Sequence, residues 1–385
     1  MDAVINKKKV QAVREHIHQY PELGFDVDNT ADFLIDELNH LGLKVTRGLG
    51  KTGFVADLVV PGAKRMIALR ADMDALPIQE KNTCDYKSKI DGKAHMCGHD
   101  AHCAMLIGAA EALVKCKEQL NVSVRFLFQP SEEVLPGGAP AMIADGALDS
   151  VDQIFGIHVM PAIEEGKLQI CQPVALSGVD LFDIEFIGKG GHASLPEITV
   201  DPMIMATQFV NQVQSIVSRN ISSFEPAVVS ITSLHIGSAY NVIADTAQLK
   251  GCVRYLSQKA ENVVKTRLFE IAQGVASTYG GRVNIDYQHG YPETRNHEDA
   301  IKQAIPAAEK VFGKENVLLS DKPWMASEDF SYYAQKIPAC YVFLGVRNAQ
   351  KGFTAMVHEP TFDLSIDAMM LGVNYYVWLI RMQQA

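Results

Sequence analysis

The residues that decide the fold are His95-Met96-Cys97-Gly98-His99-Asp100-Ala101-His102, which stand directly before an apolar run at 101–115. That run has the length and composition of a buried helix, and the run at 122–128 has those of a β-strand. The other elements of this alternation are helices at 7–18 and 28–41 and strands at 54–60, 66–69 and 153–159. Strands that alternate with helices predict an α/β domain with a largely parallel or mixed sheet, whose ligands bind at the polar strand ends.

A second kind of pattern begins at residue 180. The expected elements are a strand at 181–187, a helix at 202–217, strands at 227–235 and 246–254, a helix at 261–277 and a strand at 282–287. This β-α-β-β-α-β order is typical of a ferredoxin-like unit. The first pattern then resumes with a helix at 300–312, a strand at 339–344 and a helix at 366–382. We therefore predict a catalytic domain at 1–179 and 291–385 with a second domain inserted at 180–290.

Composition narrows the classes of protein. The chain has 385 residues, and about 150 residues per domain makes two or three domains the expectation. A net charge of −10 argues against nucleic-acid binding, which needs basic surface. No apolar run reaches the roughly 18 residues of a membrane span, and the N-terminus lacks the apolar core of a secretion signal. Seven scattered cysteines indicate reduced thiols, so we expect a soluble, cytoplasmic protein.

A nucleotide site is not expected. Residues 48–53 satisfy G-x-G-x-x-G, but that motif must open a helix, and the residues that follow look like a strand. Val45 also stands where a phosphate-binding loop needs glycine. A hairpin turn is the better interpretation.

The chemistry resides in four segments. Cys97 and His99 are two residues apart in an expected loop, and thiolate and imidazole both suit zinc-class metals. Glu132 and Glu133 follow a hydrophobic strand, and because neighbouring side chains diverge there, one can bind a metal while the other faces the substrate.

Two histidines complete the set. His158 ends an expected apolar strand, and His358 lies near the C-terminus. A lone histidine on a strand is more often a core residue than a ligand, but here four segments each offer a metal-compatible group. The candidate ligands, which are too many for one tetrahedral site and suit two ions sharing one ligand, are Cys97, His99, Glu133, His158 and His358.

With these residues the chain resembles the dinuclear-metal aminoacylase and carboxypeptidase superfamily, in its amidohydrolase branch. The motifs that carry the resemblance are Tyr20-Pro21-Glu22-Leu23-Gly24, Arg70-Ala71-Asp72-Met73-Asp74-Ala75-Leu76-Pro77, Met96-Cys97-Gly98-His99-Asp100, Gln129-Pro130-Ser131-Glu132-Glu133, Gly190-Gly191-His192-Ala193-Ser194, Ala326-Ser327-Glu328-Asp329-Phe330 and His358-Glu359-Pro360. They extend over nearly the whole chain.

The resemblance implies roles for the first-domain residues. The five candidate ligands would bind the metals, Glu132 would be the catalytic base, and Asp72 would orient a ligand. The carboxypeptidase branch has a ligand histidine where this chain has Arg70, which leaves open the ligand that bridges the two ions; Cys97 is favoured. The ions would be zinc, manganese, cobalt or nickel.

The resemblance also implies that the inserted domain is a lid that mediates homodimerisation. His192, Asn241 and Arg254 fall in segments that reach toward the substrate in similar proteins, His192 often from the partner subunit. Arg254 would hold a carboxylate through two parallel hydrogen bonds, and His192 would donate to an oxyanion.

The expected function is metal-dependent hydrolysis of the amide bond of N-acyl amino acids, with hippurate-like or N-acetyl substrates, by water activated by metal and a Glu base. The acyl group is not determined, and an N-acetyl-diaminopimelate deacetylase is an alternative. A non-catalytic binding protein on the same scaffold would have a damaged base or ligand set. A structural zinc protein would have clustered cysteines.

Overall fold

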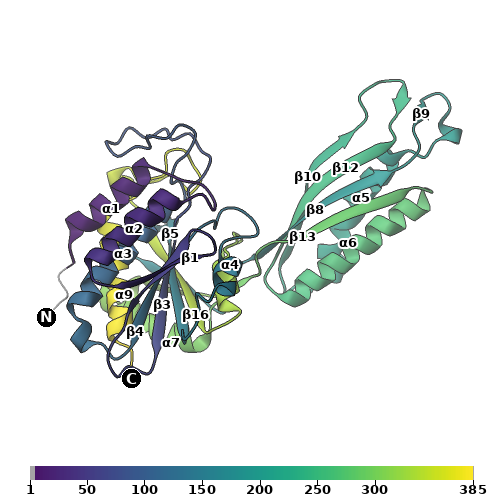
Figure 1. Cartoon of the computed structure of the whole chain (residues 1–385). Helices are drawn as coiled ribbons and strands as arrows, with labels where there is room; N and C mark the ends of the chain where they lie inside the picture. The colour runs from purple at the N-terminus through teal and green to yellow at the C-terminus, as the bar shows by residue number, and fades with distance from the viewer. Residues whose placement is uncertain (1–4, 385) are drawn as a thin grey trace. The chain divides into compact units, whose positions relative to one another are not determined.

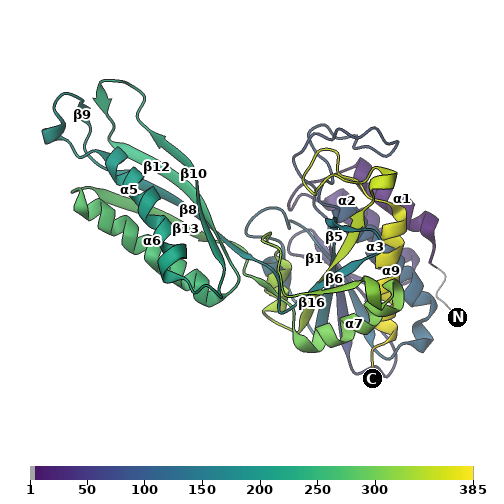
Figure 2. The same ribbon diagram turned by 180° about the vertical axis from the view of Figure 1, so that it is seen from behind.

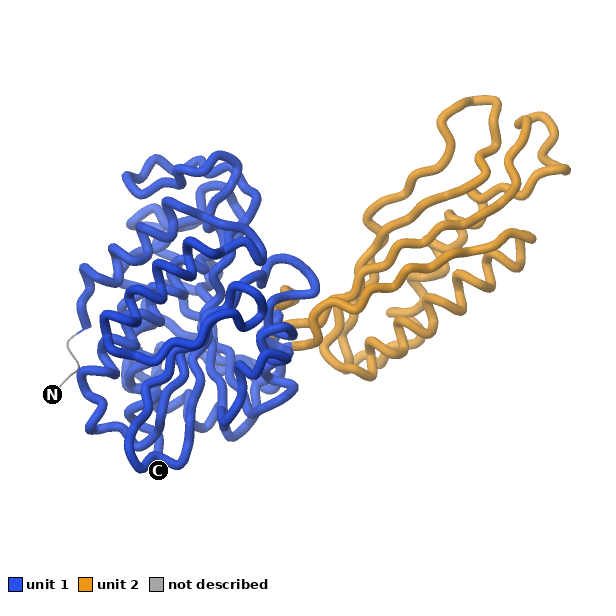
Figure 3. Tube along the Cα trace, in the orientation of Figure 1, with its two compact units in different colours: residues 1–175, 294–323, 329–385 blue, residues 176–293, 324–328 orange. Residues whose placement is uncertain are grey.

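The computed structural model describes residues 5–384, which divide into two compact units (Figure 3). The first unit comprises 5–175, 294–323 and 329–384, and the second comprises 176–293 and 324–328. The insert expected at 180–290 thus lies within the second unit. Residues 324–328 fall inside the range 291–385 that we assign to the catalytic domain from the sequence, and in the structure they lie in the second unit.

The first unit is built on an eight-stranded sheet in the order β1-β2-β4-β3-β5-β16-β6-β15 (Figures 1 and 2). Its strands are β1 (Lys44–Leu49), β2 (Gly53–Leu58), β3 (Met66–Asp72), β4 (Ser123–Gln129), β5 (Gln153–Glu164), β6 (Leu168–Cys171), β15 (Val317–Ser320) and β16 (Ala339–Arg347). The pairs β3–β4, β3–β5, β5–β16 and β6–β15 are parallel, whereas β1–β2, β2–β4 and β6–β16 are antiparallel. The predicted mixed sheet is confirmed.

Helices cover this sheet. The five longer ones are α1 (Lys7–Gln19), α2 (Asp28–His40), α3 (His99–Lys115), α7 (Glu298–Phe312) and α9 (Ile366–Arg381). Their apolar residues form one core with alternate residues of the strands, such as Ile67, Leu69 and Ala71 of β3. Because successive strand residues point to opposite faces, these helices share one face of the sheet. Two short helices, α4 (Ala139–Ala144) and α8 (Phe330–Ala334), contact each other outside that core.

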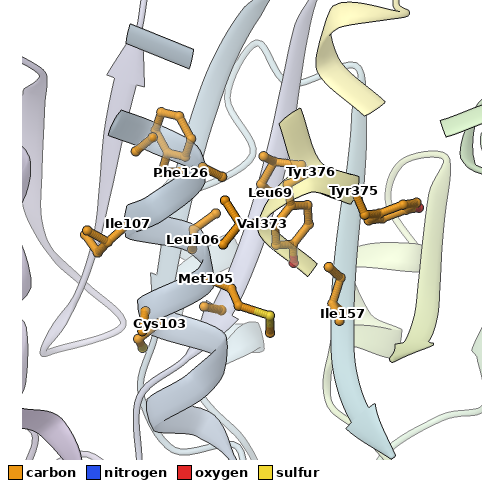
Figure 4. Packing of buried hydrophobic residues seen from close by; sticks show 14 of the residues in the cluster. Leu69, Cys103, Met105, Leu106, Ile107, Phe126, Ile157, Val373, Tyr375 and Tyr376 are labelled. Atoms are coloured by element: carbon orange, nitrogen blue, oxygen red, sulfur yellow. The ribbon is translucent and has the colours of Figure 1, made fainter. Parts of the chain in front are cut away.

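Helix α3 is the central helix of the first unit, and it is buried on all sides from His99 to Ala110. Gly108 permits this packing, since a Cβ there would lie 2.6 Å from Val10 of α1 and 3.1 Å from Val373 of α9. Figure 4 shows the surrounding core, including Leu69, Met105, Phe126, Val373 and Tyr376. The start of α3, where Cys97 and His99 lie, is therefore held by close packing.

The second unit has the predicted β-α-β-β-α-β order. Its elements are β8 (Gly178–Ile187), α5 (Pro202–Ser215), β10 (Ala227–Ile236), β12 (Thr246–Tyr255), α6 (Gln258–Thr278) and β13 (Arg282–His289). They form an antiparallel sheet in the order β10-β12-β8-β13, with both helices in one core with Phe182, Ile184 and Phe186 of β8. This is the ferredoxin-like strand order.

Shorter elements complete the description. The two-residue strands β9 (Gly191–His192) and β11 (Val242–Ile243) pair with each other, as do β7 (Val174–Leu176) and β14 (Thr294–Arg295). Single turns of helix lie at Lys117–Gln119, Pro196–Ile198, Ile216–Asn220, Lys314–Asn316 and Ala349–Lys351.

The glycine-rich segment 48–53 closes a hairpin between β1 and β2, as predicted in place of a nucleotide loop. Strand β1 itself was not expected. Lys44, Thr46 and Arg47 are exposed on this edge strand, so its sequence lacks the apolar alternation that marks a half-buried strand.

All seven cysteines lie in the described region, and each is a free thiol. No helix between residues 5 and 384 is both long enough and apolar enough to cross a membrane. The cytoplasmic location stays a prediction.

Candidate metal centre

Four segments bring the predicted metal ligands to one edge of the first unit's sheet. Cys97 and His99 lie at the start of α3, and Glu133 follows the end of β4. His358 lies in the loop before α9, where its backbone N–H donates to the carbonyl of Met96 over 2.7 Å. Parallel pairing of β3 with β4 and β5 places the ends of these strands side by side.

His158 was expected at the end of its strand, and this detail is wrong. Strand β5 continues to Glu164, because Val159 and Met160 still pair with β16. The histidine therefore projects from the middle of a strand.

The predicted ligands form two overlapping groups. The candidate ligand atoms of Cys97, His99 and His158 lie within 4.8 Å of one another, and so do those of Cys97, Glu133 and His358. Sγ of Cys97 is 3.5 Å from Nε2 of His158, and Nε2 of His358 is 3.3 Å from Oε1 of Glu133. Cys97 belongs to both groups, which is the arrangement expected of a ligand shared by two ions.

Two histidines have their ring orientation set by backbone carbonyls. Nδ1 of His99 lies 2.8 Å from the carbonyl of Asp74, and Nδ1 of His158 lies 2.7 Å from that of Val159. Because a carbonyl only accepts, each Nδ1 carries a proton, and in the neutral ring each Nε2 presents a lone pair. Nε2 of His99 is buried without any hydrogen-bond partner. A buried acceptor of this kind fits a metal ion.

The cluster has an excess of negatively charged groups. Burial raises the pKa of the Cys97 thiol, and the carboxylates of Glu133, Glu132 and Asp72 raise it further, well above its usual range. Burial lowers the pKa of His99, but Asp72, Asp74 and Glu133 outweigh that effect and raise it to about 10. A divalent cation would supply the missing charge and favour the thiolate.

Glu132 lies beside this cluster and is nearly buried. Its Oε2 is 4.0 Å from Nε2 of His99, while Oε1 of Glu133 is 3.9 Å from the same atom. The residue before the pair, Ser131, has a left-handed backbone with φ +56°. Such a conformation is strained for a residue other than glycine, and it is common where a site needs a particular side-chain direction.

We expect Asp72 to orient a metal ligand, but its carboxylate hydrogen-bonds His102 and Arg70, which are not among the predicted ligands. Oδ1 hydrogen-bonds Nδ1 of His102 over 2.6 Å, and Oδ2 accepts from Arg70 over 2.6 Å. Nε2 of His99 is 3.7 Å from Oδ2 without a hydrogen bond, because the proton of the His99 ring is directed at Asp74 instead. Asp72 therefore orients His102, whose Nε2 accepts the backbone N–H of Val159.

Sequence reasoning missed several residues that support the centre. Arg70 is buried between Asp72 and Asp329, and its Nε donates to Gln129. Asp74 accepts the backbone N–H groups of Glu132 and Glu133. The signal was present, since Arg70 and Asp74 belong to the same motif as Asp72, but the spacing alone does not say which carboxylate turns toward which partner.

A second layer of charge lies behind the centre. Asp100, next to His99, accepts from Nε of Arg14 over 3.0 Å and from Nδ1 of His18 over 2.8 Å. The other ring nitrogen of His18 lies 3.2 Å from Oε1 of Glu80. Since both nitrogens face carboxylates, the His18 ring carries two protons. Burial lowers the pKa of His18, but Asp100 and Glu80 outweigh it and raise it to about 9.

This geometry predicts a pH-dependent contribution to stability from His18. With a folded pKa of about 9 against 6.5 unfolded, the charged ring stabilises the protein below pH 6.5, and that stability is lost as pH rises through 9. At about 1.4 kcal/mol per pKa unit the loss is on the order of 3 kcal/mol. Urea unfolding of the metal-free protein at several pH values should therefore show a steeper alkaline decline for the wild type than for His18→Gln. Equal slopes would contradict the doubly protonated ring.

The predicted substrate residues lie in the second unit. Nδ1 of His192 accepts from the N–H and hydroxyl of Ser194, at 3.2 and 2.7 Å, so Nε2 of the neutral ring carries the proton. His192 pairs with Val242, and the carbonyl of Asn241 accepts the N–H of Ala193. These contacts bring His192, on β9, next to Asn241, which directly precedes β11.

Arg254 lies on β12, where one guanidinium nitrogen donates to the hydroxyl of Ser327 over 3.1 Å. The side chain is half-buried, and this contact uses one of its five N–H groups.

The chain is similar to known hydrolases and to a dinuclear metal-binding peptidase. Hippurate hydrolase of Campylobacter jejuni is 36% identical over 96% of this chain and 95% of its own length. The N-acyl-L-amino acid amidohydrolase of Geobacillus stearothermophilus is 37% identical over 76% of this chain and 79% of its own. The crystal structure of the Bacillus subtilis YXEP protein, a dinuclear metal-binding peptidase, has a TM-score of 0.85 and 30% identity, covering 98% of both chains.

Residues 68–382 match the family described as Peptidase family M20/M25/M40. That match includes each candidate ligand, the Glu132 carboxylate and the whole second unit. Together with relatives above 30% identity over most of the chain, it shows that this protein belongs to the M20/M25/M40 peptidase family.

Proposed function

We propose that this enzyme hydrolyses the amide bond of N-acyl amino acids with two divalent metal ions. The observation that carries the proposal is the pair of ligand groups that share Cys97 beside the Glu132 carboxylate. Relatives named as hippurate hydrolase, N-acetylcysteine deacetylase and N-acyl-L-amino acid amidohydrolase support the same substrate class.

The donor set fits a dinuclear site. Cys97, His99 and His158 would hold one ion, and Cys97, Glu133 and His358 would hold the other. A thiolate with imidazoles favours zinc, and manganese, cobalt and nickel also accept such ligands. When bound, the ions polarise the scissile carbonyl and make water more acidic.

Glu132 is proposed as the general base. Its Oε2 lies 4.0 Å from Nε2 of His99, which is one of the candidate ligand atoms. From there Glu132 takes a proton from the attacking water and returns it to the leaving nitrogen. A positioned base of this kind contributes about 10²–10⁴-fold to the rate.

The second unit is proposed to bind the rest of the substrate. Nε2–H of His192 is a donor suited to the developing oxyanion, because Ser194 occupies the other ring nitrogen. Arg254 would hold the free carboxylate of the amino acid, with Asn241 contributing a polar contact. A substrate without that carboxylate would lose this anchor.

Two alternatives differ in measurable ways. An N-acetyl-diaminopimelate deacetylase would act on N-acetyl-diaminopimelate in preference to simpler N-acyl amino acids. A non-catalytic binding protein would bind metal and ligand without turnover; against it, the chain retains Glu132 and all five candidate ligands.

A substrate panel tests the proposed function. We expect metal-dependent release of free amino acid from N-benzoyl or N-acetyl amino acids, and none with a chelator present. The panel should include N-acetyl-diaminopimelate and, as a matched control, hippurate with its carboxylate converted to an amide. Silence of the whole panel with zinc and manganese loaded would reject the N-acyl amino acid assignment, and equal rates for hippurate and its amide would reject carboxylate anchoring.

The proposed base is tested by Glu132→Gln. Removing the base while keeping the size of the side chain should lower kcat by at least about 100-fold. Metal content, measured by elemental analysis, should stay at the wild-type value, because Glu132 is not among the proposed ligands. Glu118→Gln, at an exposed carboxylate, is the control. A Glu132→Gln enzyme with near wild-type turnover would exclude this residue as the base.

We also propose that the protein is a homodimer formed through residues 180–290. Strand β10 is an edge of the second unit's sheet and exposes Val228 and Leu234, and Phe224 just before it is 92% exposed. Apolar side chains on an open strand edge favour association with another chain.

Gel filtration tests this assembly. At micromolar concentration the protein should elute at about twice the 42.2 kDa of the chain, whereas Val228→Lys combined with Leu234→Lys should shift it toward the monomer. A wild-type protein that elutes only as a monomer would contradict the dimer and any role for His192 in a partner's site.

A further inference from the structure

Asp74 touches three residues of the proposed metal centre, although it is neither a candidate ligand nor the base. It follows β3 and is almost fully buried. Its Oδ1 accepts the backbone N–H of Glu132 over 2.9 Å, and its Oδ2 accepts that of Glu133 over 3.1 Å. Its own carbonyl accepts Nδ1–H of His99 over 2.8 Å.

The two N–H contacts define the direction of two peptide planes. Two successive N–H groups point to one carboxylate where the chain turns, and Ser131, with φ +56°, makes the turn before Glu132 and Glu133. Consecutive N–H groups in such a turn form a concave donor site for an anion. In this protein the anion is the side chain of Asp74, so the strained turn has a permanent internal partner.

The consequence falls on the two glutamates. With both peptide planes held, Oε1 of Glu133 lies 3.3 Å from Nε2 of His358, and Oε2 of Glu132 lies 4.0 Å from Nε2 of His99. If the turn relaxed, neither side chain would keep its direction, and a ligand and the base would be misplaced together.

The His99 contact goes through the backbone of Asp74. The nearest carboxylate oxygen of Asp74 is 3.6 Å from Nδ1 of His99, longer than a hydrogen bond, whereas the carbonyl is at 2.8 Å. A side-chain substitution at Asp74 therefore leaves the His99 ring its backbone hydrogen-bond partner. Because the Asp74 charge also acts on His99, Asp74→Glu, which keeps that charge, separates the contacts to the glutamates from the change in charge.

We propose that Asp74 is the positioning residue that assigns Glu133 to the metal and Glu132 to the substrate. The inference rests on the proposed function for those two roles. It is distinct from the proposed function in that metal affinity alone can test it.

The test is Asp74→Asn in the full-length protein. The amide keeps the size of the side chain but replaces one acceptor with a donor, so one of the two N–H groups loses its partner. Titration of the chelator-treated protein with Co²⁺, followed by absorbance of the thiolate–cobalt band, should show affinity reduced about 10- to 100-fold, the usual effect of changing a residue that supports a metal ligand. At saturating metal, kcat should fall at least about tenfold with KM within a factor of about two.

Glu22→Gln is the matched control. Its two carboxylate oxygens accept the N–H groups of the successive residues Asn29 and Thr30, at 3.4 and 2.8 Å, where they cap helix α2. This substitution loses the same kind of contact outside the metal centre. Both variants should lose comparable thermal stability as metal-free proteins, but Glu22→Gln should bind Co²⁺ as the wild type does.

Wild-type Co²⁺ affinity in Asp74→Asn, or an equal loss in Glu22→Gln, would overturn the proposal. If Asp74→Asn does not fold, Asp74→Glu, which keeps the charge but displaces the oxygens, should show the same loss of Co²⁺ affinity, and wild-type affinity in that variant would overturn it. If the wild type hydrolyses no N-acyl amino acid, the proposed function fails while the Co²⁺ titration still decides the role of Asp74.

Discussion

The parallel pairing of β3 with β4 and β5 is the constraint on which the metal centre depends. Its register sets Asp72 opposite Gln129 and Arg70 opposite Gly156. The residues that follow β3 and β4 therefore lie side by side. This places Asp74 next to Glu132 and Glu133, whose backbone N–H groups it accepts. Helix α3 delivers Cys97 and His99 to the same edge because close packing on all sides leaves it one position.

Buried charge explains why the centre needs support at a distance from the ligands. Each carboxylate taken from water must be paired, because an isolated buried charge is very costly. Arg70 neutralises Asp72 and Asp329, and Arg14 with His18 neutralises Asp100. The Glu133 carboxylate and the Cys97 thiol, which face the cluster itself, lie against histidines: Glu133 against His99 and His358, and Cys97 against His158. The excess of negatively charged groups there is the electrostatic basis for a divalent metal.

Much of this organisation could be predicted from the sequence. Apolar runs of different period marked the main helices and strands in both units, and metal-compatible side chains in four segments predicted the candidate ligand set. Edge strand β1 was not predicted, because its exposed side chains show no apolar alternation. The sequence did not show that Asp72 bonds His102, which is not a predicted ligand, or that Asp74 accepts two backbone N–H groups. Two carboxylates two residues apart look alike until the structure gives the partners of each one. His358 was identifiable only with the other ligands, since nothing local distinguishes it.

The central claim is that Cys97 is shared by two metal ions, with the base Glu132 beside them. Anomalous diffraction from crystals of the manganese- or zinc-loaded protein measures this directly. The account predicts two peaks about 3.5–4 Å apart, both within bonding distance of Sγ of Cys97, with His99 and His158 on one and Glu133 and His358 on the other. A single peak, or two peaks with Cys97 bound to only one, would contradict it.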